Sequence, residues 1–229
     1  MTVPSVALII PARNEELALP QVLERVPRKI GRVIVVDNGS IDNTAGVAAA
    51  HGAQVVHEPR AGYGSACLAG LAALEHDPPH IVAFADADGS DGVENLELLL
   101  QPLLAGETDL ALSRRLPAAG MALSPQQRFG NWLATRLIRL FWRHDYHDLG
   151  PMRAITWQAL KRLQMHDRSF GWTVEMQIRA LKAGLRVTEI PLPYFVRIAG
   201  ESKISRTMTG VVRAGAKILW VIGREALQT

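Results

Sequence analysis

Asp86 and Asp88 carry the most definite chemistry in the sequence. The two carboxylates are separated by one residue and follow the apolar run His80–Ala85, whose composition is typical of a buried strand. Acids at this spacing in a loop can turn toward one hard cation, and Mg²⁺ and Mn²⁺ prefer such oxygen ligands. We therefore interpret the pair as ligands of a divalent cation that bridges a diphosphate. The structural alternative is an Asp-rich turn that caps a helix beginning near Gly92.

The elements that must position this pair follow from the hydrophobic pattern of the first half. Short apolar runs rich in β-branched residues alternate with segments of helix length, which predicts parallel strands joined by crossover helices. The expected strands are Val6–Ile10, Val33–Val36, Gln54–Val56 and Ile81–Ala85. The expected helices are Glu15–Val26, Thr44–His51, Ser65–His76 and Gly92–Leu104. The fold class is therefore α/β, with a mostly parallel sheet flanked by helices.

Three polar, acid-bearing loops follow these strands. They are Pro11–Glu16, Asp37–Thr44 and Asp86–Asp91. Since ligands of parallel sheets bind beyond the carboxyl ends of the strands, the three loops are expected to converge on one site. No G-x-G-x-x-G follows the first strand, and no G-x-x-x-x-G-K-[ST] occurs, so a Rossmann dinucleotide site and a P-loop are excluded.

Charge is distributed unevenly along the chain. Residues 1–112 carry 15 acidic and 6 basic residues, whereas residues 113–229 carry 7 acidic and 19 basic residues. No acid occurs between Ser113 and His144. The basic residues of that stretch are Arg114, Arg115, Arg128, Arg136, Arg139 and Arg143. The first half is thus suited to bind a cation and the second half to bind an anion. The simpler interpretation of the basic residues is that they form a face exposed to solvent.

The second half predicts helices, two of which are basic and contain tryptophan. The expected helices are Gln126–Arg143, Thr156–Gln164, Thr173–Ala183 and Thr207–Ala226, with a strand at Arg186–Ile190. In the first helix, Arg136, Arg139 and Arg143 share one face, and the apolar residues are Leu133, Leu137, Leu140 and Phe141. In the last helix, Arg213, Lys217, Trp220 and Arg224 recur on one face. Such helices can rest on an anionic bilayer, or they can be ordinary surface helices with their arginines in water.

Composition places the chain among ordinary globular proteins. It has 229 residues, of which 48% are hydrophobic and 21% charged. The start lacks the features of a signal peptide, and no apolar run reaches the roughly 18 residues of a membrane span. The lone Cys67 is expected to be packed, and the histidines lack zinc-ligand spacing. We expect a cytoplasmic protein, with peripheral membrane contact as an addition, and no nucleic-acid partner.

Several motifs, taken in order, resemble family 2 glycosyltransferases with the GT-A fold. They are Pro11–Glu15, Val35–Thr44, Gly62–Ala66, Asp86–Ser90, Leu112–Arg115, Arg128–Asn131, Gly171–Glu175 and Arg197–Lys203. The branch that the chain resembles is that of the dolichyl- or polyprenyl-phosphate sugar synthases, over about Val6–Ser205. The resemblance implies a glycosyltransferase domain over residues 1–205, followed by an amphipathic helix over residues 206–229.

The resemblance also implies a UDP- or GDP-sugar donor, Mg²⁺ or Mn²⁺, and inversion at the anomeric carbon. The metal ligands would be Asp86 and Asp88. The nucleotide-sugar residues would be Pro11, Arg13, Glu15, Val35, Asp37, Gly64, Ala85, Asp86, Ala87, Asp88, Arg115, Arg197 and Lys203. Asn38 stands where the family usually has a second acid, and Arg13 where it often has an aromatic residue, so the base stays open between uracil and guanine.

The acceptor decides whether a catalytic base is needed. A polyprenyl phosphate is already ionised, whereas a sugar hydroxyl must lose a proton to a nearby carboxylate. The residues implied for the acceptor are Arg115, Arg128, Asn131 and Trp172, and those implied for catalysis are Asp88, Glu175, Asp148 and Arg115. As structural alternatives, Glu175 would pair with Arg179, and Asp148 would cap a helix or pair with Arg153.

Three functions stay open on the sequence. A hexosyltransferase to a polyprenyl phosphate is favoured over a transferase to a soluble or glycan hydroxyl, for which Glu175 or Asp148 would act as base. The third is a non-catalytic module that binds a nucleotide sugar or an anionic lipid. A membrane protein that recruits the chain is compatible with each of them.

Overall fold

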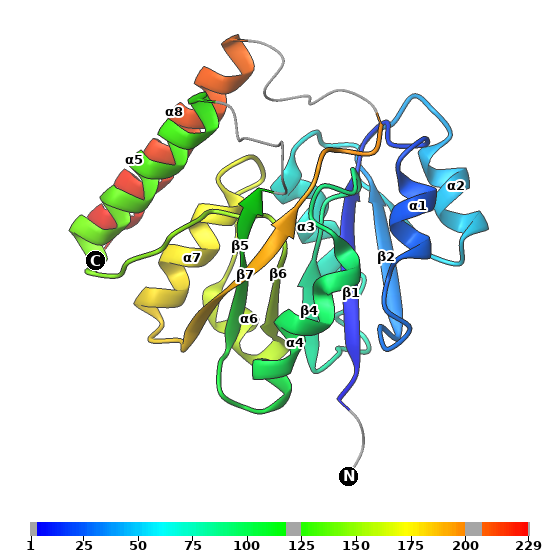
Figure 1. Cartoon of the computed structure of the whole chain (residues 1–229), viewed down its shortest axis with the longest axis horizontal. Helices are drawn as coiled ribbons and strands as arrows, with labels where there is room; N and C mark the ends of the chain where they lie inside the picture. Colours follow the sequence, from blue (N-terminus) through cyan, green and yellow to red (C-terminus); the bar gives the residue numbers. More distant parts are fainter. Residues whose placement is uncertain (1–3, 118–124, 200–207, 229) are drawn as a thin grey trace.

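The computed structural model describes residues 4–117, 125–199 and 208–228. Seven strands form one mixed sheet in the order β3-β2-β1-β4-β6-β5-β7, with helices on both faces (Figure 1). The strands are β1 Val6–Ala12, β2 Arg32–Asp37, β3 Gln54–His57, β4 Ile81–Phe84, β5 Leu110–Pro117, β6 Arg153–Thr156 and β7 Val187–Tyr194. The helices are α1 Leu19–Glu24, α2 Thr44–Ala50, α3 Tyr63–Ala72, η1 Val93–Asn95, α4 Leu96–Leu104, α5 Pro125–Trp142, α6 Trp157–Leu163, α7 Trp172–Lys182 and α8 Met208–Leu227.

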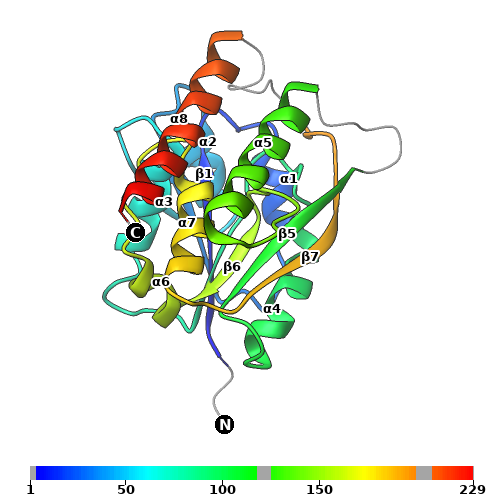
Figure 2. The same ribbon diagram turned by 90° about the vertical axis from the view of Figure 1, so that its left-hand side faces the viewer.

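The core consists of two apolar layers, one on each face of the sheet. Helices α1, α2 and α4 cover one face, and α3 and α5 to α8 cover the other (Figures 1 and 2). Strands β1 and β4 are buried on both faces, as the continuous apolar runs of central parallel strands require. The two layers therefore hold the carboxyl ends of β1, β2 and β4 at one rigid edge.

The parallel strands of the first half are confirmed. Strand β1 pairs in parallel with β2 and with β4, and β2 pairs in parallel with β3. The first helix begins at Leu19 rather than Glu15, because the backbone of Glu15 and Glu16 bonds to the neighbouring loop. Gly92, at φ 61°, separates the Asp-rich loop from the helix that follows it.

Strands β5 and β6 were not predicted from the sequence pattern. Strand β6 is antiparallel to both of its neighbours, β4 and β5, and so joins the parallel part to the edge pair β5–β7. Its four residues are too few for a periodic signal, and the two arginines in the second half of β5 obscure its buried first half. These two strands bring Arg115 and Arg153 into the sheet.

The helices expected in the second half, and the strand at Arg186–Ile190, are present with small shifts at their ends. Within the described residues, no helix combines the length and the apolar character needed to cross a bilayer. The expected boundary between residues 205 and 206 lies outside the described residues.

Cys67 is fully buried on α3, as expected. Burial, together with the nearby charge of Asp86, raises the pKa of its thiol well above the usual range. We predict that the native protein does not react with an aromatic disulfide reagent at pH 8, because the thiolate is both rare and inaccessible. The control is the same assay in denaturant, which should release one thiol per chain; rapid reaction of the native protein would contradict the packing.

Candidate active site

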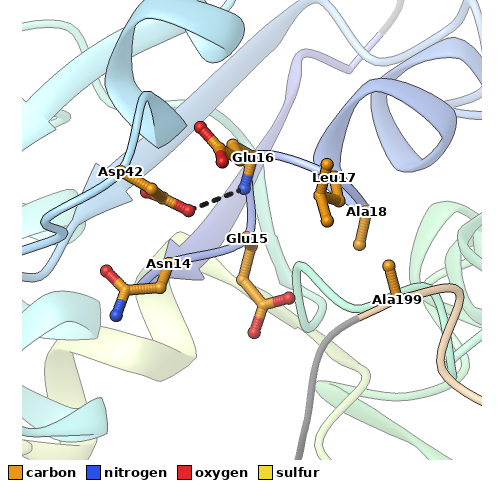
Figure 3. Close-up of a pocket in the computed structure, with 7 residues that line it drawn as sticks. All are labelled: Asn14, Glu15, Glu16, Leu17, Ala18, Asp42 and Ala199. Carbon is orange, nitrogen blue, oxygen red and sulfur yellow. Dashed lines mark hydrogen bonds between the residues drawn. The ribbon is translucent and has the colours of Figure 1, made fainter.

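The loops after β1 and β2 are joined by side-chain hydrogen bonds. The backbone amide of Glu15 donates to Thr44 Oγ1 at 2.8 Å, and that of Glu16 donates to Asp42 Oδ2 at 3.2 Å (Figure 3). Asn14 adopts φ 51°, a conformation that asparagine tolerates, and its Oδ1 accepts from the amide of Ile41 at 2.8 Å. The polar residues that follow two different strands are thus held in one fixed arrangement.

A small hollow lies between these loops and the segment that follows β7. It has a volume of about 70 Å³ and is lined by Asn14, Glu15, Glu16, Leu17, Ala18, Asp42 and Ala199 (Figure 3). Pockets for small organic ligands usually measure roughly 300–1,000 Å³. The hollow is therefore too small for a nucleotide sugar, and it marks one margin of the site.

Asp37 ends β2 as a buried carboxylate with two polar neighbours. Its Oδ1 accepts from the amide of Ser40 at 3.0 Å, and its Oδ2 lies 3.2 Å from Nδ1 of His57. Although burial acts to raise it, the hydrogen bonds from Ser40 and His57 leave the pKa of Asp37 below its usual value. Asp37 is therefore an ionised acceptor at the edge of the sheet, the property expected of a residue that receives donors from a nucleoside.

Asn38 stands at the position where the resembled family usually has an acid, and its side chain here has a structural role. Its amide donates to the carbonyls of Glu58 and Arg60, and its Oδ1 accepts from the amide of Gly62 at 2.8 Å. These bonds fix the loop that leads into α3. A carboxylate could not donate the two bonds to carbonyls, so the amide is the side chain that this loop requires.

Gly62 and Gly64 allow α3 to pack against the segment 167–169. A Cβ at either position would overlap a carbonyl of that segment, and Gly62 also has φ 144°. The amides of Gly64 and Ser65 donate to the carbonyls of Ser169 and Arg168. Gly64 was expected to contact the nucleotide-sugar donor, but it is covered by protein backbone.

We predict that Gly64→Ala destabilises the protein by about 2 kcal/mol, because the added methyl group must displace backbone rather than a mobile side chain. Chemical denaturation would measure this loss. The matched control is Gly130→Ala on α5, where the added methyl group would meet no atom within 4 Å apart from its chain neighbours and the backbone of its own helix. Helix propensity should there add roughly 1 kcal/mol of stability. Equal stability of the two variants would contradict the packing at Gly64.

The loop after β4 brings Asp86, Asp88 and Asp91 together. The amide of Asp86 donates to Asp91 Oδ2 at 2.9 Å, while Asp88 Oδ1 accepts from the amide and hydroxyl of Ser90 at 2.9 and 2.6 Å. Burial and the neighbouring acids raise the pKa of Asp86 well above its usual range. Burial, with a further contribution from the charge of Asp88, raises the pKa of Asp91 to about 7. The residues around the loop therefore balance only part of the negative charge of its carboxylates.

The arrangement fits a hard divalent cation. Asp91 is 4% exposed, and its Oδ1 has no hydrogen-bond partner among the described residues. Close carboxylates with raised pKa values are the donor set that Mg²⁺ or Mn²⁺ prefers, because the ion relieves their repulsion. Asp86 and Asp88 would hold the ion, with Asp91 beside them.

Arg197 lies against this acidic loop. Its guanidinium donates to Asp88 Oδ2 at 2.7 Å and to Glu15 Oε1 at 3.4 Å, so it joins the loops after β4 and β1. Its Nη1 is buried without a hydrogen-bond partner among the described residues, which leaves a donor for a phosphate oxygen. Lys203, the second cation expected here, lies outside the described residues.

We predict that Arg197→Met tightens Mn²⁺ binding in the absence of nucleotide by about tenfold, because a charge-assisted bond worth about 1.5–3 kcal/mol no longer competes for Asp88. Titration of Mn²⁺ by calorimetry measures the effect. Arg32→Met, which removes an exposed pair with Asp77 at 3.0 Å, is the matched control and should leave Mn²⁺ binding unchanged. Weaker Mn²⁺ binding by Arg197→Met would count against competition at Asp88.

A second group of ligand-type residues, His166, Glu175 and Glu225, has ligand atoms within 4.8 Å of one another. Its carboxylates already face cations, however, since Arg224 lies 2.8 Å from both acids. Lys182 lies 3.0 Å from Glu225. The group is an ion-pair network in which basic side chains already neutralise both acids, so we assign no metal to it.

Glu175, one of the two expected bases, is the centre of that network. It is fully buried and accepts from the amides of His166 and Asp167 at 3.2 and 2.8 Å. The pair with Arg179 that the sequence offered as an alternative is present at 3.6 Å. The carboxylate thus anchors α8 and the segment 166–167 and offers no exposed oxygen to an acceptor.

Asp148, the other expected base, forms a bidentate pair with Arg115. Both distances between the guanidinium and the carboxylate are 2.7 Å, and the amide of Arg115 also donates to Asp148. The partner is Arg115 rather than Arg153, because β5 and not β6 carries its arginine toward Asp148. Buried Arg153 instead donates to the carbonyls of Gly150, Pro151 and Thr173.

The other expected site residues fall into two groups. Val35, Ala85, Ala87 and Trp172 are buried, with Trp172 packed edge-on against Phe84 at 6.0 Å between ring centroids. Pro11 is half-buried and Arg13 exposed beside β1, while Arg128 is exposed on α5. Asn131 accepts from the amide of Leu149 at 2.9 Å. Their contacts with donor or acceptor stay predictions, and the complete burial of Val35 and Trp172 favours packing roles.

The structure adds Tyr63, Ser90 and Asp91 to the site. A hydrogen bond from Tyr63 partly offsets the rise in the pKa of Asp86, and Ser90 orients Asp88. Tyr63 lies between the two glycines of the Gly62–Gly64 turn, so the motif itself was visible in the sequence. Its contact with Asp86 depends on the packing of α3 against the sheet.

The fold and the site together define a GT-A glycosyltransferase. The model of the family Glycosyl transferase family 2 matches residues 7–163, and the chain belongs to this family. A solved structure of glucosyl-3-phosphoglycerate synthase from Mycobacterium tuberculosis, in complex with Mn²⁺, UDP and glucosyl-3-phosphoglycerate, has the same fold. Its TM-score is 0.79 at 23% identity, covering 97% of this chain and 80% of that one.

Two relatives are similar over nearly their whole length. The uncharacterized glycosyltransferase Rv0539 of Mycobacterium tuberculosis is 42% identical, over 92% of this chain and 94% of the relative. The undecaprenyl-phosphate mannosyltransferase of Micrococcus luteus is 30% identical, over 94% of this chain and 96% of the relative. The expectation of a family 2 glycosyltransferase with the GT-A fold is confirmed.

Proposed function

We propose that this glycosyltransferase moves a hexose from a UDP- or GDP-sugar to a polyprenyl phosphate at the cytoplasmic face of a membrane, with inversion at the anomeric carbon. The observation that carries the proposal is the meeting of Asp86, Asp88 and Asp91 with Arg197 beyond the carboxyl end of β4. Acids for a cation and a guanidinium for phosphate lie side by side there, as a nucleoside diphosphate requires.

In this proposal the nucleoside lies against the loops after β1 and β2, where Asp37 accepts from its base or ribose. Asp86 and Asp88 hold Mg²⁺ or Mn²⁺, which neutralises charge on the departing diphosphate when bound. Arg197 donates to the same diphosphate through Nη1, which has no other acceptor among the described residues. These groups stabilise charge that develops as the bond between the anomeric carbon and the diphosphate oxygen breaks.

The state of the two candidate bases supports a phosphate acceptor. Glu175 is fully buried among cations, and Asp148 is held by Arg115, so neither offers a free carboxylate oxygen to a hydroxyl. A phosphate monoester is ionised at neutral pH and attacks without a base. Its oxygen forms the new bond to the anomeric carbon as the nucleoside diphosphate leaves. The name of the Micrococcus luteus relative is consistent with an acceptor of this class.

The first experiment measures thermal stability with UDP, GDP and their sugar conjugates, each with and without Mn²⁺. A ligand at 100 times its dissociation constant should add about 2.7 kcal/mol, which raises the melting temperature by several degrees. A shift that requires Mn²⁺ and one nucleotide family would support the donor site and identify the base. If no nucleotide shifts a well-folded sample, a non-catalytic lipid-binding module becomes the better hypothesis.

The second experiment identifies the acceptor. With the donor so defined, transfer of labelled sugar is measured to a polyprenyl phosphate and, separately, to free sugars and the dephosphorylated polyprenol. We expect product with the phosphate alone. Product with the polyprenol or a sugar would overturn the phosphate acceptor while leaving the glycosyltransferase in place.

A further inference from the structure

Helices α5 and α8 lie side by side, and each exposes large apolar side chains. They pack against each other at the opposite end of the molecule from α1 and α2 (Figures 1 and 2). The exposed large apolar side chains of α5 are Phe129, Trp132, Leu140 and Phe141. Those of α8 are Val212, Leu219, Trp220 and Leu227. We call these eight residues the two-helix surface.

The exposed residues of α8 follow a helical period. Val212, Ala216, Leu219, Gly223 and Leu227 are spaced by three or four residues and all face solvent. The helix also buries apolar residues against the core, Val221 and Ile222 among them, so it is apolar on two sides. An apolar stripe this long on a water-exposed face indicates a partner.

Ion pairs help to set the orientation of α8. Lys217 pairs with Asp167 at 2.8 Å, and Arg224 pairs with Glu175 at 2.8 Å. The same two cations lie over the ring of Trp220, at 4.2 and 5.0 Å from its centroid. Together with the buried apolar residues of the helix, the ion pairs hold α8 with its apolar stripe outward, and the two cations orient the 54% exposed Trp220.

Basic residues predominate around the two-helix surface, although exposed Asp145, just after α5, pairs with Arg139 at 3.1 Å. Exposed arginines accompany the apolar residues, while α5 contains no acid and the acid of the described part of α8, Glu225, is buried. The exposed arginines are Arg128, Arg136, Arg139, Arg143 and Arg213. Helices α1 and α2, at the opposite end of the molecule (Figure 1), belong to residues 1–112, which carry the excess of acids. An anionic surface would thus attract one side of the molecule and repel the other.

We propose that the two-helix surface binds the headgroup layer of an anionic bilayer, with the apolar side chains inserted and the arginines at the lipid phosphates. Aromatic and aliphatic side chains within a basic rim are the composition of an interfacial helix. A second copy of the chain would bring like-charged arginines together, so self-association is disfavoured. The proposal rests on the proposed function in one respect, because a lipid-linked acceptor requires the enzyme to work at the membrane surface.

The test measures binding of the full chain to phosphatidylcholine vesicles with and without phosphatidylglycerol, by flotation. We expect binding that requires phosphatidylglycerol and falls with added salt. The double variant Trp132→Ser/Trp220→Ser should weaken binding by roughly tenfold or more, and Arg136→Gln/Arg139→Gln by about fivefold for each charge removed. Leu98→Ser, at an exposed leucine on α4, and Lys29→Gln are the matched controls and should bind as the unmodified protein does.

Nucleotide-induced thermal shifts of the same variants separate this proposal from the proposed function. Unchanged shifts with lost vesicle binding would support a docking surface distinct from the donor site. Absence of vesicle binding by the unmodified protein at low salt would overturn the proposal whatever the nucleotides do. A concentration-dependent dimer that Trp132→Ser/Trp220→Ser abolishes would also overturn it, in favour of an interface between two copies of the chain.

Discussion

Replacing Asp88 with asparagine is expected to reduce glycosyl transfer by about a thousandfold while leaving the fold intact. The variant keeps an oxygen for Ser90 but loses the charge that faces Arg197 at 2.7 Å and that would hold the divalent cation. Removing one preorganised electrostatic group from an active site costs roughly 10²–10³ in rate, and loss of a metal ligand lies at the upper end. Steady-state transfer assays across a range of Mn²⁺ concentrations measure the effect.

The control for Asp88→Asn is Asp77→Asn, the same change at an exposed acid that pairs with Arg32. It should leave transfer and Mn²⁺ dependence unchanged. Circular dichroism should give both variants the same spectrum as the unmodified protein. Full activity of Asp88→Asn would remove this acid from the catalytic site.

Replacing Glu175 with glutamine is expected to lower the free energy of unfolding by about 3 kcal/mol. The carboxylate is fully buried and lies 2.8 Å from Arg224 and 3.6 Å from Arg179, so its loss leaves cations with too little opposing charge. Breaking a buried ion pair by removing one partner typically costs about 3–5 kcal/mol. Chemical denaturation measures the loss, and we expect α8 to exchange its amide hydrogens faster than the sheet does.

This variant also separates the two roles considered for Glu175. An anchoring carboxylate predicts lower stability with a pH–rate profile of unchanged shape, whereas a catalytic base predicts normal stability and the loss of one limb of that profile. Glu97→Gln, at an exposed acid paired with Lys29, is the matched control and should change stability by less than about 1 kcal/mol. Normal stability of Glu175→Gln would contradict the anchoring role.

The same network has a defined dependence on pH. Although burial acts to raise it, hydrogen bonds from Lys182 and Arg224 hold the pKa of Glu225 below its reference value of 4.5. Its contribution to stability is therefore present at neutral pH and is lost as the pH falls through the lower, folded-state pKa. Below pH 4.5 the attachment of α8 should weaken as the Glu225 carboxylate becomes protonated.

The sequence alone predicted the parallel half of the sheet and the order of the site motifs along the chain. Continuous apolar runs such as Val6–Ile10 bury both faces of a strand, and this requirement leaves a pattern that local composition reveals. The polar loops after β1, β2 and β4 could be placed together because parallel strands end at one edge. The Asp86-x-Asp88 pair and its position directly after a strand were likewise predicted from the sequence.

The tertiary structure decided which partner each charged residue has. Asp148 pairs with Arg115 rather than Arg153, Glu175 lies inside an ion network rather than at an acceptor, and Arg197 reaches Asp88 from 109 positions away in the chain. Strands β5 and β6 were not predicted, because a four-residue strand and a strand interrupted by two arginines carry no clear period. Helical spacing also could not tell which face of α8 is exposed, since both faces are periodic. Burial of Val221 and Ile222 against the core and ion pairs with α7 and the neighbouring loop fix that choice, and such long-range contacts leave no local pattern in the sequence.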